Sequence, residues 1–198
     1  MRRPKNHYSF FGYLKLCYYV LFTKLLFPKA RIVRLPIEIR GRKFIDFGEG
    51  LTTGKGCRFE AFSEIDIKRI TFGKCIQLND YVHISAMNKV VIGDNVLMAS
   101  HIYISDNSHG SYKGVHQSSP ESSPIERSYY TAPVLIEDNV WLGEGVVVMP
   151  GVTIGRGCII GANSTVTKSI PAWCIAVGQP AKVIKQYDFS QKQWIIVE

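Results

Sequence analysis

Residues 136–170 read IEDNVWLGEGVVVMPGVTIGRGCIIGANSTVTKSI, and in this stretch an aliphatic residue returns at every sixth position. A second series, mostly small or apolar, follows the first by four residues. An α-helix repeats every 3.6 residues and a half-buried strand every two, so neither explains a sustained period of six. A hexapeptide period is typical of a parallel β-helix, in which we expect three hexads to close one triangular coil. The first series is Ile136, Leu142, Val148, Ile154, Ile160 and Val166, and the second is Val140, Val146, Val152, Cys158, Ser164 and Ile170.

The same period occurs earlier in the chain, but its register is interrupted. The earlier series are Ile39, Ile45, Leu51 and Cys57, then Ile70, Ile76 and Val82, then Ile92, Met98 and Ile104. Val82 and Ile92 are ten residues apart, which indicates four residues that bulge out of the coil. Residues 106–132 have no period and are rich in Gly, Pro and Ser. A long loop inside an otherwise economical solenoid is usually functional.

These patterns predict an all-β protein with a single domain of sufficient length for a substantial core. Residues 35–171 form the parallel β-helix, and the loop 106–132 protrudes from it. Residues 1–34 form a helical N-terminal segment, and residues 172–198 form a C-terminal tail with a short helix near its end. Gly143, Gly155 and Gly161 each follow an inward residue, where we expect the chain to bend tightly.

The five cysteines show no spacing of the zinc or redox type. Their odd number and the lack of a removable signal peptide favour a reducing compartment, and we expect a cytoplasmic protein. Cys57 and Cys158 fall on inward positions, where a thiol serves as a small apolar filler.

Positive charge is concentrated near the N-terminus. Residues 1–43 hold eleven Lys and Arg against the single acid Glu38, whereas the remainder has thirteen basic and fifteen acidic residues. This asymmetry indicates an anionic partner. Nucleic acid is disfavoured because no recognition motif accompanies the charge. A phosphorylated substrate and anionic lipid headgroups both stay open.

Residues 8–27 (YSFFGYLKLCYYVLFTKLLF) predict one helix that ends at Pro28. Phe11, Leu14, Tyr18, Leu21 and Leu25 advance by three or four residues and form one helical face. Lys15 and Lys24 interrupt the apolar run, which argues against a membrane span. Two interpretations remain: the helix packs on the β-helix or a neighbouring subunit, or it lies in peripheral contact with a membrane surface.

The chemistry is best sought in residues 105–110 (SDNSHG), where the loop leaves the coil. His109 titrates near neutrality and could take a proton from a hydroxyl group. Asp106 is the nearest carboxylate that could orient its ring, although a backbone carbonyl would serve as well. A histidine in a Ser- and Gly-rich loop is also what an ordinary surface loop contains. A zinc site with His83 and His101 is disfavoured, because the break before Ile92 should put them at different positions on their strands.

The sequence resembles the hexapeptide-repeat sugar O-acetyltransferases, which include the galactoside and maltose acetyltransferases. Residues 93–109 (GDNVLMASHIYISDNSH) resemble the segment that leads to the catalytic histidine of this family. The coenzyme A half is matched by residues 136–143 (IEDNVWLG), 150–155 (PGVTIG), 160–162 (IGA), 166–168 (VTK) and 178–185 (GQPAKVIK). The likeness to the bacterial lipopolysaccharide and exopolysaccharide branch covers most of the chain, including residues 40–42 (RGR), 46–54 (DFGEGLTTG) and 60–62 (EAF).

The resemblance implies a left-handed β-helix and a role for individual residues. His109 would be the general base, and Asn79 would help hold the acceptor. The residues implied to bind acetyl-CoA are Trp141, Gly143, Glu144, Gly161, Ala162, Thr167, Lys168, Lys182 and Lys185. Trp141 would line the pantetheine channel, the main-chain N–H groups of Glu144 and Ala162 would donate to the thioester and pantetheine, and the last four residues would face the nucleotide phosphates. Trp141 could instead cover a coil corner, and the lysines could be ordinary surface charges.

The chain departs from the family pattern at three places. Lys182 stands where relatives often have Arg, which removes a planar bidentate donor. Ser108 precedes the histidine where some relatives have Asn. No acidic residue stands near Ala86–Met87, where the galactoside enzymes bind their acceptor. The acceptor is therefore expected to differ from theirs.

The resulting prediction is a homotrimeric, metal-free acetyltransferase that uses acetyl-CoA to acetylate a sugar hydroxyl, in an acceptor that is lipid-linked, nucleotide-activated or polymeric. A ternary complex needs no enzyme nucleophile, and the sequence shows no activated Ser or Cys motif. Two alternatives remain open. One is an N-acyltransferase that acts on an amino sugar, and the other is a non-catalytic β-helix scaffold.

Overall fold

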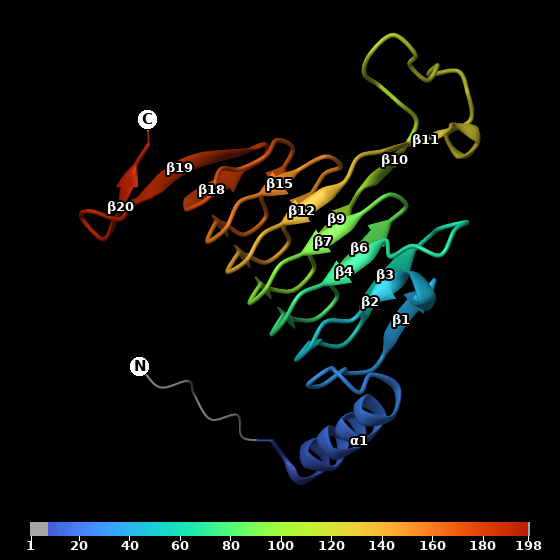
Figure 1. Ribbon diagram of the computed structural model, residues 1–198, viewed down its shortest axis with the longest axis vertical. Coiled ribbons are helices and arrows are strands. Elements are labelled where there is room, and N and C mark those ends of the chain that lie inside the picture. The colour runs from blue at the N-terminus through green and yellow to red at the C-terminus, as the bar shows by residue number, and fades with distance from the viewer. Residues whose placement is uncertain (1–7, 198) are drawn as a thin grey trace.

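The computed structural model describes residues 8–197, and its chain winds into successive coils with three parallel sheets as their sides (Figure 1). Residues 1–7 of the predicted N-terminal segment lie outside the described part. The first side, here the β3 face, has the strand order β1-β3-β6-β9-β14-β17, the β7 face has the order β15-β12-β7-β4-β2, and the β13 face contains β5, β8, β13, β16 and β18. This is the predicted left-handed parallel β-helix.

The strands are short, as hexads with intervening corners require. The β3 face contains β1 (Ile37–Arg40), β3 (Cys57–Ala61), β6 (His83–Ala86), β9 (Tyr103–Ser105), β14 (Val147–Val148) and β17 (Thr165–Val166). The β7 face contains β2 (Ile45–Asp46), β4 (Ile70–Phe72), β7 (Val90–Ile92), β12 (Val134–Ile136) and β15 (Thr153–Ile154). The β13 face contains β5 (Gln77–Leu78), β8 (Leu97–Met98), β13 (Trp141–Leu142), β16 (Ile159–Ile160) and β18 (Cys174–Gly178).

Both six-residue series point into the coils. Ile136, Leu142 and Val148 come from the three different faces of one coil, and each is fully buried. Cys57 and Cys158 are buried as predicted, and burial raises the pKa of each thiol to about 11. The core is therefore a stack of aliphatic layers, one layer for each coil.

The coil corners correct the prediction made for the glycines. The sharp bend with positive φ falls on another six-residue series: Asn139, Gly145, Gly151, Gly157 and Asn163. At Gly155, by contrast, an added Cβ would lie 2.4 Å from the backbone nitrogen of Ala172, and at Gly143 it would lie 2.6 Å from that of Ala162. Gly143, Gly155 and Gly161 are thus required by the close approach of the next coil, and not by backbone curvature.

The protruding loop has an ordered base that its sequence did not predict. Its two ends form an antiparallel ribbon of β10 (Asn107–His109) and β11 (Tyr129–Thr131), and a 3₁₀ turn, η2 (Pro124–Glu126), lies before the return strand. The loop leaves the β-helix at the corner between the β3 and β7 faces (Figure 1).

The tail also differs from the prediction. β18 continues the β13 face by parallel pairing with β16, and β19 (Ala181–Asp188) and β20 (Gln193–Ile196) then extend this sheet in antiparallel fashion. The expected short helix is therefore wrong. In residues 181–186, half-buried and exposed positions alternate, which is the period of a strand.

The N-terminal helix α1 (Phe10–Leu26) is capped by Ser9, whose Oγ accepts a hydrogen bond from Gly12 N. The buried residues of α1 are Tyr19 and Thr23. The Thr23 hydroxyl donates to Tyr19 O at 2.6 Å and accepts from Val33 N at 2.8 Å, which ties the helix to the chain that enters the first coil. Next to the helix, four aromatic rings close the N-terminal end of the core: Phe27, Phe47, Phe59 and Phe72. The turn η1 (Arg42–Phe44) connects β1 to β2.

The apolar helical face predicted from the sequence does not pack on this chain. Phe11, Leu14, Tyr18, Leu21 and Leu25 are each between 52% and 81% exposed. The helix attaches through the opposite side, so packing of this face onto the chain's own β-helix is wrong. No helix within residues 8–197 has the length and apolar character needed to cross a bilayer.

We expect Ile136→Ala to lower the free energy of unfolding by about 2–5 kcal/mol, because a cavity in a stacked layer cannot collapse freely. Ile125→Ala is a matched control, since Ile125 is 82% exposed in the loop, and its effect should stay within about 0.5 kcal/mol. Urea unfolding of both variants measures the difference. Equal losses would contradict the assignment of Ile136 to the core.

Candidate active site

His109 ends β10, and its imidazole is exposed beside Tyr129 of the return strand. The two rings have centroids 4.5 Å apart, and the Tyr129 hydroxyl lies 3.4 Å from His109 Nε2. The backbone of His109 is held more firmly, because the Tyr112 hydroxyl donates to its carbonyl oxygen at 2.6 Å. The ring is therefore accessible to a substrate while its main chain is anchored.

Arg127 continues this anchor through the loop. Its Nη1 donates to the Tyr112 hydroxyl at 2.9 Å, and its Nη2 donates to Ser122 O at 2.7 Å. The sequence did not point to Tyr112, Arg127 or Tyr129. A loop without periodicity offers no signal for the pairing of its two ends.

The ribbon has two sides with different surroundings, because successive side chains in a strand point in opposite directions. On one side, Asn107 Nδ2 donates to Ser85 Oγ of the β3 face at 3.4 Å, and His109 shares this side. On the other side, Ser108 and Tyr130 line a cavity of about 180 Å³ together with Met149 and Thr167. The structure thus brings Thr167, from the implied acetyl-CoA set, next to the strand that carries His109.

Asp106 has different partners from the one suggested by its position in the sequence. The side chain is fully buried, and its carboxylate accepts from the backbone N–H groups of Met87, Asn88 and Lys89 at 2.9, 2.7 and 2.6 Å. Asn107 Nδ2 also donates to it, at 3.0 Å. Asp106 therefore fixes the start of the ribbon to the preceding coil, and its hydrogen bonds do not reach the His109 ring.

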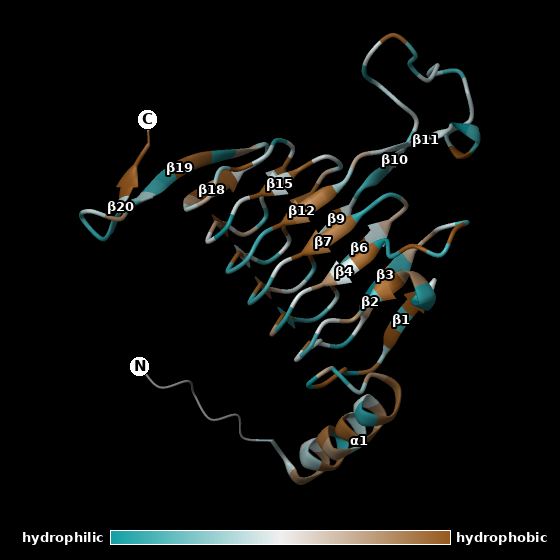
Figure 2. Cartoon of the chain, viewed as in Figure 1, coloured by the Kyte–Doolittle hydropathy of each residue, from teal (hydrophilic) through white to brown (hydrophobic). Residues whose placement is uncertain are grey.

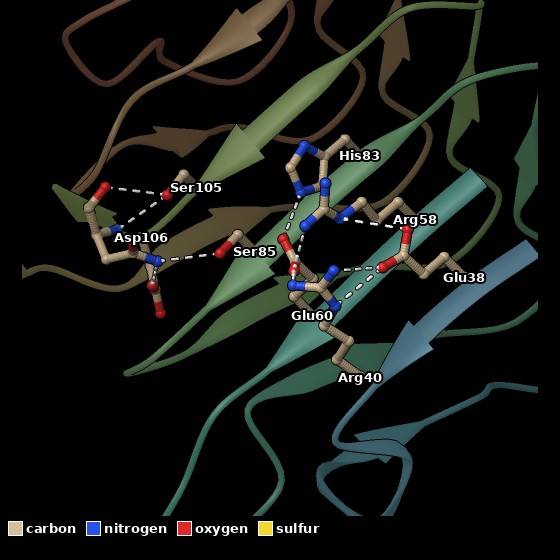
Figure 3. Close-up of polar contacts among 9 residues, drawn as sticks. Glu38, Arg40, Arg58, Glu60, His83, Ser85, Ser105 and Asp106 are labelled. Carbon is tan, nitrogen blue, oxygen red and sulfur yellow. Dashed lines mark hydrogen bonds and ion pairs between the residues drawn. The ribbon is translucent and has the colours of Figure 1, made fainter. Parts of the chain in front are cut away.

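A polar cluster lies on the outer surface of the β3 face, with Ser85 and Ser105 on the neighbouring strands (Figure 3). It consists of Glu38, Arg40, Arg58, Glu60 and His83, which we call the Glu60 cluster. Glu60 accepts from Arg58 at 2.7 Å and lies 2.8 Å from His83 Nε2 and 3.1 Å from Arg40. Its side chain is only 8% exposed.

The charges around Glu60 outweigh its burial. Desolvation alone would raise the pKa of this carboxyl, but hydrogen bonds from Arg58 and His83 hold the pKa below its ordinary value. Glu60 therefore stays ionised and presents its basic partners as an ordered set of donors. The cluster is continuous with the His109 ribbon, because Glu60 is paired in register with Ser85 and Ser85 with Ser105, which donates to Asn107 O at 3.0 Å.

The implied acetyl-CoA residues other than Thr167 and Lys168 gather along the β13 face. Trp141, Ile159, Ile175 and Lys185 are successive register partners on neighbouring strands, so their side chains share the outer surface. Lys182 pairs with Val177 beside them, and Trp141 is 49% exposed. These outward side chains therefore form one row across the β13 face, from the exposed indole of Trp141 to Lys185.

Gly143, Glu144, Gly161 and Ala162 stack at the corner where the β13 face meets the β3 face. Within residues 8–197, the amides of Glu144 and Ala162 donate no hydrogen bond, although those of Gly143 and Gly161 bond to Ile160 O and Ala176 O. Two adjacent unpaired donors of this kind suit the carbonyl groups of a thioester and a pantetheine arm.

One chain does not unite all of the expected site residues. His109, Thr167 and Lys168 lie at the corner between the β3 and β7 faces, whereas Glu144 and Ala162 lie at another corner. Asn79 also lies at that second corner, several coils earlier, and lines a cavity of about 830 Å³ with Leu16 and Val20 of α1.

The other histidines occupy different positions on their coils, as predicted. His83 lies within β6 beside Tyr103, with ring centroids 5.1 Å apart, and His101 lies at a corner, stacked on Tyr81 at 5.0 Å. In the described part of the chain, no group of three or more His, Cys, Asp or Glu side chains is placed to hold a metal ion.

Comparison with known proteins agrees with this architecture. Residues 133–168 match the family model described as bacterial transferase hexapeptide (six repeats). The chain is 42% identical over 190 residues to WbbJ of Escherichia coli K12, covering 96% of this chain and 95% of WbbJ. The name of WbbJ describes it as a candidate O-acetyl transferase of lipopolysaccharide biosynthesis.

Solved structures similar in fold include two acyltransferases. A maltose O-acetyltransferase from Clostridium difficile superposes with a TM-score of 0.56 at 31% identity, covering 74% of this chain and 72% of that one. A variant of the N-acyltransferase AntD from Bacillus cereus, in complex with coenzyme A and dTDP-4-amino-4,6-dideoxyglucose, gives a TM-score of 0.68 at 20% identity, covering 82% and 84%. The chain therefore belongs to the hexapeptide-repeat acetyltransferases. Within them it is an enzyme of the sugar O-acetyltransferase family.

We expect Asp106→Asn to loosen the ribbon, because an amide presents one oxygen and one NH₂ group to three backbone donors. Losing charge-assisted bonds at a fully buried site should cost about 1–3 kcal/mol. Hydrogen exchange at the amides of Met87, Asn88 and Lys89 should accelerate. Asp66→Asn, at an exposed position, is the control. Unchanged protection at the three amides would refute this role of Asp106.

Proposed function

We propose that this enzyme transfers the acetyl group of acetyl-CoA to a sugar hydroxyl during the synthesis of bacterial lipopolysaccharide O-antigen or exopolysaccharide. The observation that carries this proposal is the exposed imidazole of His109, held on an anchored ribbon beside the polar β3 face. The 42% identity to WbbJ over nearly the whole chain supports the substrate class.

His109 acts as the general base in this proposal. The acceptor hydroxyl attacks the acetyl carbonyl carbon while the imidazole takes its proton, and the thioester C–S bond breaks to release coenzyme A. A main-chain N–H, with Glu144 and Ala162 as the candidates, stabilises the negative charge on the carbonyl oxygen. Direct transfer between two bound substrates requires no covalent enzyme intermediate. Asp106 acts as a positioning residue, since it holds the ribbon and not the ring.

Acetyl-CoA is the donor substrate that the residues fit. The unpaired amides of Glu144 and Ala162, the exposed Trp141 and the lysines Lys168, Lys182 and Lys185 supply the donors, apolar contact and cations that its parts require. Thr167 and the glycines Gly143 and Gly161 complete this set. No metal enters the proposed reaction.

A homotrimer is the assembly that would complete this site. His109 and the two amides lie at different corners of one chain, so a second copy has to bring its β13 corner to the ribbon of the first. A closed three-fold ring makes the same contact three times. Asn79, proposed to assist acceptor binding, lies at the corner that such a neighbour would supply.

The acceptor is expected to lie over the Glu60 cluster. Its carboxylates, guanidinium groups and imidazole offer both acceptors and donors, which suits the many hydroxyl groups of a sugar. N-acylation of an amino sugar, as suggested by the fold of AntD, is the alternative. A base such as His109 favours a hydroxyl over a neutral amine, and the stability of the product to mild alkali distinguishes amide from ester.

The enzyme is proposed to work in the cytoplasm, where acetyl-CoA is available, at the inner face of the membrane.

We expect His109→Ala to lower kcat by about 10²–10⁴-fold, the effect of removing a general base. Binding of acetyl-CoA, measured by calorimetry, should be retained because the ring does not belong to the donor site. His116→Ala is a matched control, since His116 is exposed in the same loop. Near-normal turnover of the His109 variant would refute the assignment.

The lysine variants Lys168→Ala, Lys182→Ala and Lys185→Ala should raise the KM for acetyl-CoA and leave kcat at saturation almost unchanged. Each removes a cation that faces phosphate, and added salt should weaken the difference because exposed charge pairs are screened. Lys74→Ala, at an exposed position of an earlier coil, is the control. An unchanged KM at low ionic strength would contradict the phosphate-binding role.

A further inference from the structure

The outer surface of α1 carries the apolar face that the β-helix leaves uncovered. Phe10, Phe11, Leu14, Leu21 and Leu25 point away from the buried side defined by Tyr19 and Thr23, and Phe10 is 73% exposed. Figure 2 shows this helix at the N-terminal end of the coils, with hydrophobic residues along it. We call this surface the α1 stripe, formed by Phe10, Phe11, Leu14, Tyr18, Leu21 and Leu25. A contiguous exposed patch of this kind marks an interaction surface.

The charges around the α1 stripe indicate what it contacts. Lys15 and Lys24 are exposed on α1, and Lys29, Arg31 and Lys43 are exposed in the segments that follow it. The helix contains no Asp or Glu, and Glu38 is the only acid in residues 8–43. A second copy of α1 would present the same cations and offer no carboxylate to pair with them. An anionic layer pairs with these cations and takes up the apolar stripe.

We propose that the α1 stripe docks this enzyme on a bilayer that contains anionic lipids, with α1 lying in the headgroup region. The aromatic and aliphatic side chains enter the boundary between headgroups and acyl chains, and the lysines on either side contact lipid phosphates. The helix lies on the membrane and does not cross it. Its 17 residues span about 26 Å at 1.5 Å each, less than the ~30 Å hydrocarbon core.

Docking through α1 would hold the His109 ribbon and the Glu60 cluster near the lipid surface. On the β3 face, β9 lies three strand spacings from β1, which is about 14 Å at the usual ~4.8 Å per spacing. The ribbon of His109 leaves directly after β9, and the Glu60 cluster lies between it and α1. This consequence depends on the proposed function: the acceptor is a glycan carried on a membrane lipid, within reach of the headgroup layer. The docking itself does not depend on it.

Vesicle flotation of the full-length protein tests the docking. The probes are vesicles of phosphatidylcholine alone and of phosphatidylcholine mixed with phosphatidylglycerol. We expect the protein to float with the mixed vesicles and to bind neutral vesicles at least about tenfold more weakly, with high salt reducing the difference. Absence of binding to the mixed vesicles, or equal binding to both, would overturn the proposal.

Two matched pairs of variants locate the surface. Leu21→Glu with Leu25→Glu should abolish flotation, whereas Val115→Glu with Ile125→Glu, which adds the same charge at loop positions 94% and 82% exposed, should float as the unaltered protein does. Lys15→Gln with Lys24→Gln should weaken binding to mixed vesicles, whereas Lys113→Gln with Lys192→Gln should not. Flotation of the Leu21 and Leu25 variant at the unaltered level would contradict docking through α1.

The same samples test whether a second copy of the chain, and not a bilayer, covers the α1 stripe. They also separate a failure of docking from a failure of the proposed function. Light scattering gives the mass of the assembly in each variant. If the Leu21 and Leu25 variant has a smaller mass and the unaltered protein ignores vesicles, the α1 stripe is an interface between copies and the docking proposal fails. Acetyl-CoA binding by calorimetry uses no lipid, so its loss would count against the proposed function alone.

Discussion

Every coil of this protein is held to the next by main-chain hydrogen bonds between parallel strands, and this pairing requires each turn to return to the same three faces. The strands are mostly two or three residues long, so no single turn could form alone. Stability comes from repetition, because each layer buries its aliphatic side chains only against the layers above and below. Gly143 and Gly155 let neighbouring backbones approach closely enough for this stacking, and Gly161 leaves room for the Val177 side chain of the next coil. Extra residues can therefore leave the solenoid only at a corner, and that is where the loop 106–132 departs.

The location of the proposed active site follows from this constraint. A corner insertion starts with a side chain that still belongs to the coil, and here the first residue, Asp106, is buried on three backbone amides. Three residues later His109 is exposed. A short ribbon thus separates the rigid coil from the proposed base, and one side of β10 faces the polar β3 face while the other side faces Thr167.

The sequence predicted the periodic parts of the structure well, because a six-residue period has one structural explanation. It predicted the inward series, the burial of the Cys57 and Cys158 thiols, and the break at Asp106. It failed where contacts are not periodic: the pairing of β10 with β11, the anchor from Arg127 through Tyr112, and the antiparallel tail.

The helix is the most instructive case. Its period correctly indicated an apolar face on α1. A period carries no information on which side of the helix contacts the rest of the protein, and here the smaller face around Thr23 makes that contact. The roles of His109 and of the implied acetyl-CoA residues came from resemblance, and their distribution over two corners became visible only in the structure.

The buried cysteines have a further consequence for how this solenoid could be observed in motion. With pKa values of about 11, Cys57 and Cys158 are almost entirely protonated at neutral pH, and the protonated thiol is a poor nucleophile. Because both side chains are also buried, we expect them to react only when their own layer opens. Cys57 starts β3 near the helix end of the stack, whereas Cys158 lies beside β16 near the opposite end. In a solenoid whose ends can fray independently, the alkylation rate of Cys57 would report the opening rate of one end and that of Cys158 the opening rate of the other.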